Sequence, residues 1–248
     1  MSVLDSKKRI LISQPEPKTG SPYTDIVNKY GLEIDFSPFF TVEPVDIKDF
    51  RAQRINILDY TAIVFSSRTA IDAFFDLATK MRVAIPETMK YFCQSEAIAL
   101  YLQKYIIYRK RKIFFGNGTT ASLIDCIGSK HKGEYFLISS TDAPKKDIED
   151  MFTNAKFKFG SAVMVQTVYS DIKNIDLSKY GMLVFYSPAD VKSLFENHPD
   201  FTLNDLLIAT YVKNTAKAVK DASLSIEIEA PTPESPSIAA ALSKYFGK

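Results

Sequence analysis

Short apolar runs alternate with amphipathic segments along the whole chain. The runs are rich in Val, Ile and Phe, which is typical of strands buried on both faces. The pattern predicts strands at Arg9–Ser13, Ala62–Phe65, Tyr91–Cys93, Ile113–Phe115, Tyr135–Ile138, Ala162–Tyr169, Met182–Tyr186, Leu206–Ala209 and Ser225–Ile228. Helical periodicity separates most of these runs. The order of elements therefore predicts an α/β fold with parallel sheets covered by helices.

The pattern also repeats within the chain. Val64–Ile71 aligns with Val184–Val191, 120 residues later, and each copy is an apolar strand, a Ser and a helix start. Ile10–Ser13 likewise resembles Phe136–Ser139. One such pair could arise in any α/β protein, because strand–turn–helix units resemble one another. Several pairs in the same order favour a duplication. Because the period is far longer than that of solenoid repeats, we expect two flavodoxin-like lobes.

Composition narrows the class of protein without naming a ligand. The 248 residues are 46% hydrophobic and 24% charged, with a net charge of +2, as in ordinary globular proteins. No apolar run is long enough to span a membrane. Cys93 and Cys126 have neither the count nor the spacing of a disulfide framework or a zinc site. With a polar segment before the first strand, we expect a cytoplasmic protein without a signal peptide.

One basic cluster, Arg109–Lys112, stands out from the balanced charge. It is either a solvated connection between a helix and the next strand or a positive rim that attracts an anion. Binding of nucleic acid would call for more such clusters, so we expect none.

Several well-known catalytic motifs are absent from the sequence. It has no Gly-x-Gly-x-x-Gly, no phosphate-binding Gly-Lys-Ser/Thr loop, no Gly-x-Ser-x-Gly and no His-Glu-x-x-His. Gly116–Gly118 is too short for a dinucleotide site, and neither His131 nor His198 has an obvious partner in the sequence. We therefore expect no metal and no nucleotide cofactor.

Hydroxyl residues follow several predicted strands, at the points where helices begin. Ser67 and Ser187 stand at N-cap positions, and Thr215 opens an Ala-rich helix. The unpaired N–H groups of a helix N-terminus bind carboxylates, and ligands of open α/β sheets gather at this edge. Each residue therefore has two interpretations, a simple helix cap or one contact to a ligand that carries several carboxylates.

Tyr169 ends the longest extended segment of the chain, Phe157–Tyr169. Its phenol is suited to donating a proton or a hydrogen bond to a leaving hydroxyl. The alternative is a packing residue whose hydroxyl reaches solvent.

At these positions the chain resembles the uroporphyrinogen-III synthase family over nearly its whole length. No single motif is specific, but their order and spacing are distinctive. The matching segments are Phe65–Arg68, Val168–Tyr169, Phe185–Pro188, Thr215–Val219 and Ala230–Pro233.

The resemblance implies two flavodoxin-like parallel-sheet lobes with a cleft between them. A pair of extended linker strands, here Leu32–Val42 and Ala162–Tyr169, would join the lobes. One lobe would combine residues 1–38 with 168–248, and the other would be 39–167.

The resemblance also implies a function, the cyclisation of hydroxymethylbilane, a linear tetrapyrrole polycarboxylate, with inversion of its last ring. The substrate supplies its own electrophile and nucleophile, so no cofactor is needed. Tyr169 matches the family tyrosine proposed to assist loss of the hydroxyl. The expected substrate-binding residues are Ser66, Ser67, Ser95, Ser187 and Thr215.

Two departures from the family pattern keep an alternative open. Val212 stands where the family often has Gly before the Thr-Ala pair, and Glu96 would place a negative charge near the rim that binds carboxylates. A Cβ at such a turn obstructs the approach of a ligand to backbone amides. The alternative is a non-catalytic, two-lobed ligand-binding or regulatory protein of the same family. In both cases we expect a monomer that binds neither nucleic acid nor membranes.

Overall fold

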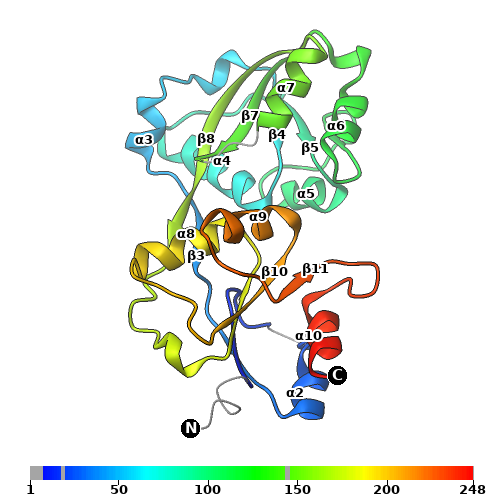
Figure 1. Cartoon of the computed structure of the whole chain (residues 1–248). Helices are drawn as coiled ribbons and strands as arrows, with labels where there is room; N and C mark the ends of the chain where they lie inside the picture. Colours follow the sequence, from blue (N-terminus) through cyan, green and yellow to red (C-terminus); the bar gives the residue numbers. More distant parts are fainter. Residues whose placement is uncertain (1–7, 18–19, 143–145, 248) are drawn as a thin grey trace. The chain divides into compact units, whose positions relative to one another are not determined.

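The chain divides into two compact units that are each built on one sheet (Figure 1). A computed structural model describes residues 8–17, 20–142 and 146–247. Unit 1 comprises residues 1–41 and 168–248, and unit 2 comprises residues 42–167. Across the described residues, no helix is long and apolar enough to cross a membrane.

Unit 1 contains a parallel sheet with the strand order β11-β10-β9-β1-β2. Taken in chain order this is 2-1-3-4-5, the order of flavodoxin-like sheets. Its strands are β1 (Arg9–Ile12), β2 (Glu33–Phe36), β9 (Met182–Phe185), β10 (Leu207–Tyr211) and β11 (Ile228–Ala230). Its helices are α2 (Thr24–Tyr30), α8 (Pro188–Asn197), α9 (Lys213–Asp221) and α10 (Ile238–Phe246).

Both faces of this sheet are covered, which explains why its central strand, β9, is apolar without alternation. Met182 and Val184 of β9 pack in the core on the side of α2 and α10. Leu183 and Phe185 pack in the core on the side of α8 and α9. Successive side chains of a strand point to opposite faces, so a strand buried on both faces has to be apolar at every position.

Unit 2 contains a six-stranded sheet with the order β3-β8-β7-β4-β5-β6. Strands β4 to β8 are parallel to one another, and β3 is antiparallel to β8, as the hydrogen bonds Val45 N to Met164 O (3.0 Å) and Ser170 N to Phe39 O (2.9 Å) show. The strands are β3 (Phe40–Pro44), β4 (Ala62–Phe65), β5 (Lys90–Cys93), β6 (Ile113–Phe115), β7 (Tyr135–Thr141) and β8 (Lys158–Tyr169).

Helices again cover both faces of the sheet in unit 2. The core around Phe65 and Phe74 includes residues of α3, α4 and α5, and the core around Phe92 and Phe136 includes residues of α6 and α7. The helices are α3 (Ile47–Ala52), α4 (Arg68–Lys80), α5 (Glu96–Tyr101), α6 (Thr120–Ile127) and α7 (Lys146–Asn154). Single turns of 3-10 helix lie at Ile57–Asp59, Leu102–Lys104, Ser129–His131 and Leu177–Lys179.

The two units share one strand plan, so the predicted internal repeat has a structural counterpart. The repeated segments form β4 with the start of α4 in unit 2 and β9 with the start of α8 in unit 1. In unit 2, the pair β7 and β8 takes the sheet positions that β1 and β2 take in unit 1. The fold class predicted from the sequence, α/β with flavodoxin-like parallel sheets, is confirmed.

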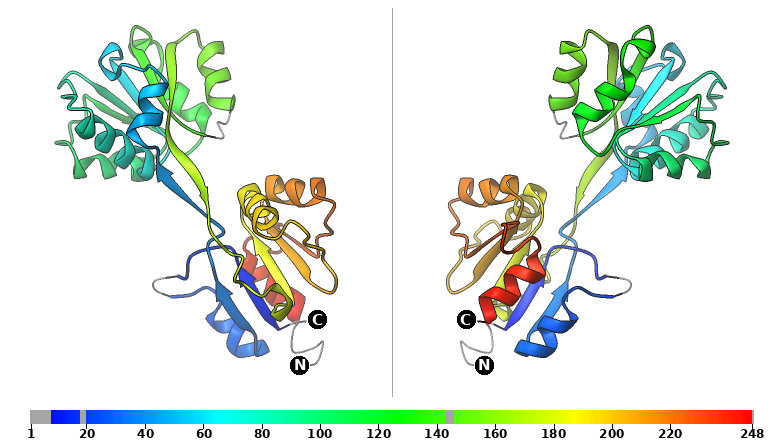
Figure 2. Two further views of the ribbon diagram at one scale, coloured as in Figure 1. Left: turned by 90° about the vertical axis from the view of Figure 1, so that its left-hand side faces the viewer. Right: turned by 90° about the vertical axis from the view of Figure 1, so that its right-hand side faces the viewer.

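The prediction of one linker strand over Leu32–Val42 is wrong in one respect, because the segment forms two strands. Its first part is β2, which pairs with β1 inside unit 1, and its second part begins β3, which runs beside β8 (Figure 2). Between them lies Pro38, which has no N–H to donate to a ladder. Phe39 then turns inward, is 1% exposed and packs against Phe185 at a ring distance of 5.9 Å.

Candidate functional site

The predicted hydroxyl residues lie at the carboxyl edges of the two sheets, where parallel strands end and helices begin. In unit 2, Ser66 and Ser67 follow β4, and Ser95 follows β5. In unit 1, Ser187 follows β9, and Thr215 lies in the first turn of α9. Ligands of open α/β sheets bind at such edges. Each set is gathered on one edge, and the two sets belong to different units.

The turn between β4 and α4 presents free donors. Ser67 caps α4, because its Oγ accepts a hydrogen bond from the N–H of Ala70 (3.1 Å). Ser66 is exposed, and within the described part of the chain the amides of Ser66 and Ser67 donate to no protein acceptor. The helix behind them has 13 residues and places partial positive charge at this turn. The geometry suits a carboxylate.

Ser95 lies in a pocket of about 640 Å³ at the ends of β5 and β6. It stands at the N-cap of α5 but makes no side-chain cap hydrogen bond. The pocket also contains Glu96, so one negative charge lies next to this hydroxyl. The residues lining it are Ser95, Glu96, Ala97, Phe115, Gly116, Asn117, Ser122 and Cys126.

The corresponding turn of unit 1, between β9 and α8, is closed by a carboxylate. Asp190 Oδ2 accepts hydrogen bonds from the N–H groups of Tyr186 and Ser187, both at 2.8 Å. Ser187 Oγ in turn accepts from the N–H of Ala189 (3.2 Å), which completes a capping box with Asp190. The amides at this helix start are therefore already paired, and the hydroxyl of Ser187 is the group left to donate.

Asp190 is fully buried, and burial raises the pKa of its carboxyl to about 6. The N–H groups of Tyr186 and Ser187 and the hydroxyl of Ser13 oppose this rise in pKa by favouring the carboxylate. Ser13 thus lies beside Asp190, although neither Ser13 Oγ nor Asp190 Oδ1 makes a hydrogen bond of ordinary geometry. One carboxylate oxygen is paired twice and the other has no partner.

Four buried oxygens without partners belong to this edge of unit 1. Among the described residues, the fully buried side-chain atoms that lack a hydrogen-bond partner include those of Ser13, Asp190, Thr210 and Thr215. Ser13 follows β1, and Thr210 of β10 pairs with Phe185 of β9. Buried polar groups are nearly always paired, so such a group calls for a ligand, a water or another functional reason.

Sequence reasoning did not single out Ser13, Asp190 or Thr210. The spacing Ser187-x-x-Asp190 is a capping-box pattern, so Asp190 had a local signal in the sequence. Ser13 and Thr210 had none, because only the sheet brings β1 and β10 to the two sides of β9.

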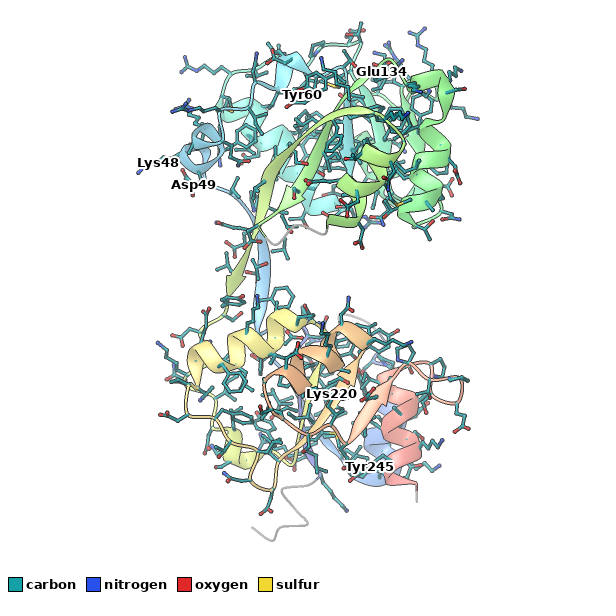
Figure 3. The ribbon with its side chains drawn as sticks, turned by 45° about the horizontal axis from the view of Figure 1, so that its top comes forward. Lys48, Asp49, Tyr60, Glu134, Lys220 and Tyr245 are labelled. Carbon is teal, nitrogen blue, oxygen red and sulfur yellow. The ribbon has the colours of Figure 1, made fainter. Side chains whose placement is uncertain are left out.

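Thr215 and Val212 mark the start of α9. Thr215 is 0% exposed with an unpartnered hydroxyl, whereas Lys220 further along the helix (Figure 3) is exposed and pairs with Glu229 (2.5 Å). Val212 stands at the N-cap with φ 65° and ψ 149°. Only glycine adopts this region without strain, so the turn keeps a glycine-type backbone around a β-branched side chain. Val212 is 39% exposed, so its methyl groups lie at the surface of this edge.

Tyr169 is the last residue of β8 and is half-buried in unit 1. A pair of phenols lies at the end of β9, where the hydroxyls of Tyr23 and Tyr186 are 2.6 Å apart. Burial raises the pKa of both Tyr23 and Tyr186, so these phenols stay neutral at ordinary pH. The ring of Tyr186 also packs on Tyr211 at 5.4 Å. Unit 1 therefore offers neutral phenols near the end of β9.

Both histidines have structural roles. His131 is 5% exposed and packs on Phe92 and Phe114, with ring distances of 5.3 and 4.4 Å, and burial lowers its pKa. Nε2 of His198 lies 3.1 Å from the carbonyl oxygen of Ile172. In the part of the chain that the structure describes, no group of three or more His, Cys, Asp or Glu side chains could hold a metal ion.

The basic segment 109–112 lies at the opposite edge of the unit 2 sheet from the predicted hydroxyls. It directly precedes β6, and the carbonyl of Lys112 accepts from the N–H of Tyr91 near the start of β5 (2.7 Å). Arg109 contacts Glu87 at 3.6 Å. This position agrees with a connection into a strand and does not place the cluster on the rim of the hydroxyl edge.

Fold and site together define a class: a protein of two flavodoxin-like units with hydroxyl residues at the carboxyl edges of its sheets. The family model described as uroporphyrinogen-III synthase HemD matches residues 21–240. The chain therefore belongs to the uroporphyrinogen-III synthase family, whose activity is that of a cyclising lyase in tetrapyrrole biosynthesis.

Solved structures agree with this assignment at the level of the fold. Uroporphyrinogen-III synthetase from Helicobacter pylori is 12% identical, with a TM-score of 0.60 over 97% of this chain and 99% of that chain. A mutant uroporphyrinogen III synthase from the extremely thermophilic bacterium Thermus thermophilus is 12% identical, with a TM-score of 0.55 over 96% of this chain and 97% of that chain. No curated protein sequence matches the chain. The family expected from the sequence is confirmed, and none of the comparisons favours the non-catalytic alternative.

The backbone strain at Val212 leads to a prediction about stability. Val212→Gly should raise the free energy of unfolding by about 1 kcal/mol, because relief of the strained φ outweighs the added freedom of the unfolded chain. The measurement is urea unfolding of both proteins. Val212→Ala keeps a Cβ and serves as the matched control, which should gain much less. Equal effects of the two substitutions would contradict strain as the cause.

The buried Asp190 carboxyl predicts a dependence of stability on pH. Its pKa is about 6 in the folded protein and about 3.8 as the reference value, so the folded state binds more protons between these values. The stability it contributes is therefore complete below pH 3.8 and is lost as pH rises through about 6. Relative to Asp190→Asn, the wild type should lose about 2 kcal/mol of unfolding free energy between about pH 4 and pH 7. Parallel stability profiles for the two proteins, measured by denaturant unfolding, would argue against a perturbed Asp190.

Proposed function

We propose that this chain cyclises hydroxymethylbilane to uroporphyrinogen III with inversion of the last pyrrole ring. In this proposal Tyr169 assists departure of the substrate hydroxyl, and the hydroxyl residues at the carboxyl edges bind the substrate carboxylates. The observation that supports the activity most strongly is the family match over residues 21–240. The structure adds carboxyl edges with free amide and hydroxyl donors, which suit a polycarboxylate substrate.

Substrate carboxylates bind at the carboxyl edge of each unit. In unit 2, the free amides of Ser66 and Ser67 at the start of α4 are the main anion donors, and Ser95 adds a hydroxyl in the neighbouring pocket. In unit 1, Thr215 at the start of α9 and the hydroxyl of Ser187 donate. The buried, unpartnered Thr215 hydroxyl is the clearest of these, because a ligand acceptor would complete its hydrogen bonding.

The reaction needs positioning more than strong acid–base chemistry. The hydroxyl of the substrate leaves with its bonding electrons and takes up a proton to become water, and the substituted carbon of the last ring bonds to the electrophilic carbon left behind, which gives a spiro intermediate. The older bond from that ring carbon to its methylene bridge then breaks, and the methylene bonds to the free carbon of the same ring, which loses a proton. The net reaction thus consumes no proton. Tyr169, at the end of β8, assists departure of the hydroxyl by donating a hydrogen bond from its phenol. Holding the reacting ends of the linear chain together supplies the rest.

The proposed partner is this linear tetrapyrrole alone. The absence of a nucleic-acid partner, the monomeric state and the cytoplasmic location remain predictions from the sequence.

The proposal is tested with enzymatically generated hydroxymethylbilane and separation of the type I and type III products. Spontaneous closure gives the type I isomer, so product identity distinguishes catalysis from background. Tyr169→Phe should slow formation of the type III isomer by about a hundredfold, because positioned proton transfer contributes about that much. Tyr245→Phe on α10 (Figure 3) is the matched control and should retain full activity. Type I product alone from the wild type, at the uncatalysed rate, would refute the proposed function.

Thr215→Val should separate binding from stability. Valine keeps the shape of threonine but removes a hydroxyl that has no protein partner, so the variant should be at least as stable as the wild type. The KM for hydroxymethylbilane should rise about two- to tenfold, the equivalent of one lost hydrogen bond of about 0.5 to 1.5 kcal/mol. Thermal unfolding and steady-state kinetics on the same sample measure both effects. Destabilisation with an unchanged KM would show that the hydroxyl serves the fold.

A further inference from the structure

The two copies of the repeat differ in charge at one buried position, where unit 1 has Asp190 and unit 2 has Ala70. The residues lie 120 positions apart, each three residues after the N-cap serine of its helix. Both serines cap their helices, Ser67 through the N–H of Ala70 (3.1 Å) and Ser187 through the N–H of Ala189 (3.2 Å). Because unit 2 builds the same strand, turn and helix with alanine, the fold of this turn does not require the carboxylate.

The carboxylate changes which backbone donors each turn offers. In unit 1, Asp190 Oδ2 takes the N–H groups of Tyr186 and Ser187, both at 2.8 Å. In unit 2, the equivalent amides of Ser66 and Ser67 have no acceptor within the described residues, and Ser66 is exposed. Two adjacent free amides at the start of a long helix form an anion-binding turn. The turn of unit 2 is open to an external anion, whereas the turn of unit 1 is occupied by the carboxylate of Asp190.

The closed turn lies where a flavodoxin-like sheet favours ligands. Strand order reverses between β1 and β9 in unit 1, and such switch points form the crevices that bind ligands. Around Asp190 at this point, Ser13 is 2% exposed and Asp190 is 0% exposed, and neither Ser13 Oγ nor Asp190 Oδ1 makes a hydrogen bond of ordinary geometry. In unit 2 the equivalent serine, Ser139, donates instead to the carbonyl of Val64 (2.7 Å). Unit 1 thus has a polar setting built around a carboxylate, whereas the equivalent position in unit 2 is already saturated.

We propose that Asp190 is a built-in carboxylate that occupies the backbone amides of the Tyr186–Ser187 turn in unit 1, so that substrate carboxylates are bound by backbone amides at the Ser66–Ser67 turn of unit 2 and by side-chain hydroxyls alone in unit 1. The inference rests on the proposed function, since it concerns how the same substrate is recognised. A linear tetrapyrrole repeats similar acidic side chains along its length, and two equivalent anion-binding turns would not distinguish between them. An acid in one copy makes the two turns differ, because only the turn of unit 2 then offers backbone amides to a substrate carboxylate.

The first test uses formate as a probe for the anion-binding turn in unit 1. Asp190→Ala should free the two amides and leave a space of carboxylate size, so formate should raise the thermal unfolding midpoint of this variant in a saturable manner. The wild type, and Asp190→Asn, whose amide oxygen still fills the turn, should show no saturable response. An Asp190→Ala protein that folds and ignores formate overturns the proposal.

The second test transplants the acid into the other copy. Ala70→Asp should close the turn of unit 2 and raise the KM for hydroxymethylbilane at least tenfold, with kcat within about threefold of the wild type, since binding and not chemistry is removed. Ala70→Ser is the matched control, because serine is too short to pair both amides, and it should leave KM unchanged. A folded Ala70→Asp protein with wild-type KM overturns the proposal.

The product assay and the formate response test the proposed function and the role of Asp190 separately. If the wild type forms no type III product, the proposed activity fails while the formate response still decides whether Asp190 fills an anion-binding turn. If the wild type is active and the formate response is absent, the activity stands and the role of Asp190 falls. Should Ala70→Asp fail to fold, the formate arm alone decides.

Discussion

Burial of parallel strands on both faces is the constraint from which the rest of this structure follows. Along the central strands of such a sheet the backbone groups are paired and the side chains pack against helices, which leaves little room there for polar chemistry. It collects where the strands end. Ser67, Ser95, Ser187 and Thr215 all stand at such ends, and the helices that begin there add partial positive charge. A scaffold built this way is suited to holding anions before any catalytic group is added.

The two units repeat that scaffold, so the chain has two such edges, and the edges differ in sequence. At the end of each sheet, three residues lie level with one another on neighbouring strands and form a row. In unit 2 this row is Ser139, Phe65 and Cys93, and in unit 1 the corresponding row is Ser13, Phe185 and Thr210. In unit 2 the hydroxyl of Ser139 has a hydrogen-bond partner and the other two side chains of the row are not hydroxyls. In unit 1 the hydroxyls of Ser13 and Thr210 make no hydrogen bond of ordinary geometry, and the buried Asp190 lies beside Ser13. The two edges therefore offer different hydrogen-bonding groups to a ligand.

The carboxyl edge of unit 1 also contains two features that lower the free energy of unfolding. Val212 holds a β-branched side chain in a backbone region that suits glycine, and Thr215 buries a hydroxyl that no protein group satisfies. Each feature lowers stability and each lies at the start of α9. Strain and unsatisfied polar groups persist where binding compensates for them, which agrees with a ligand at this helix start.

The sequence by itself determined the alternation of strands and helices, the family and the capping serines, because these depend on local patterns: apolar runs, the Ser-to-helix spacing and the order of motifs. It misjudged the segment 32–42, where Pro38 and the burial of Phe39 break one predicted strand into two. Only the tertiary structure decided that Ser13 and Thr210 flank β9, and that Asp190 closes one turn while Ala70 leaves the other open. These relations join residues far apart in the chain, and no local pattern encodes which strands lie side by side.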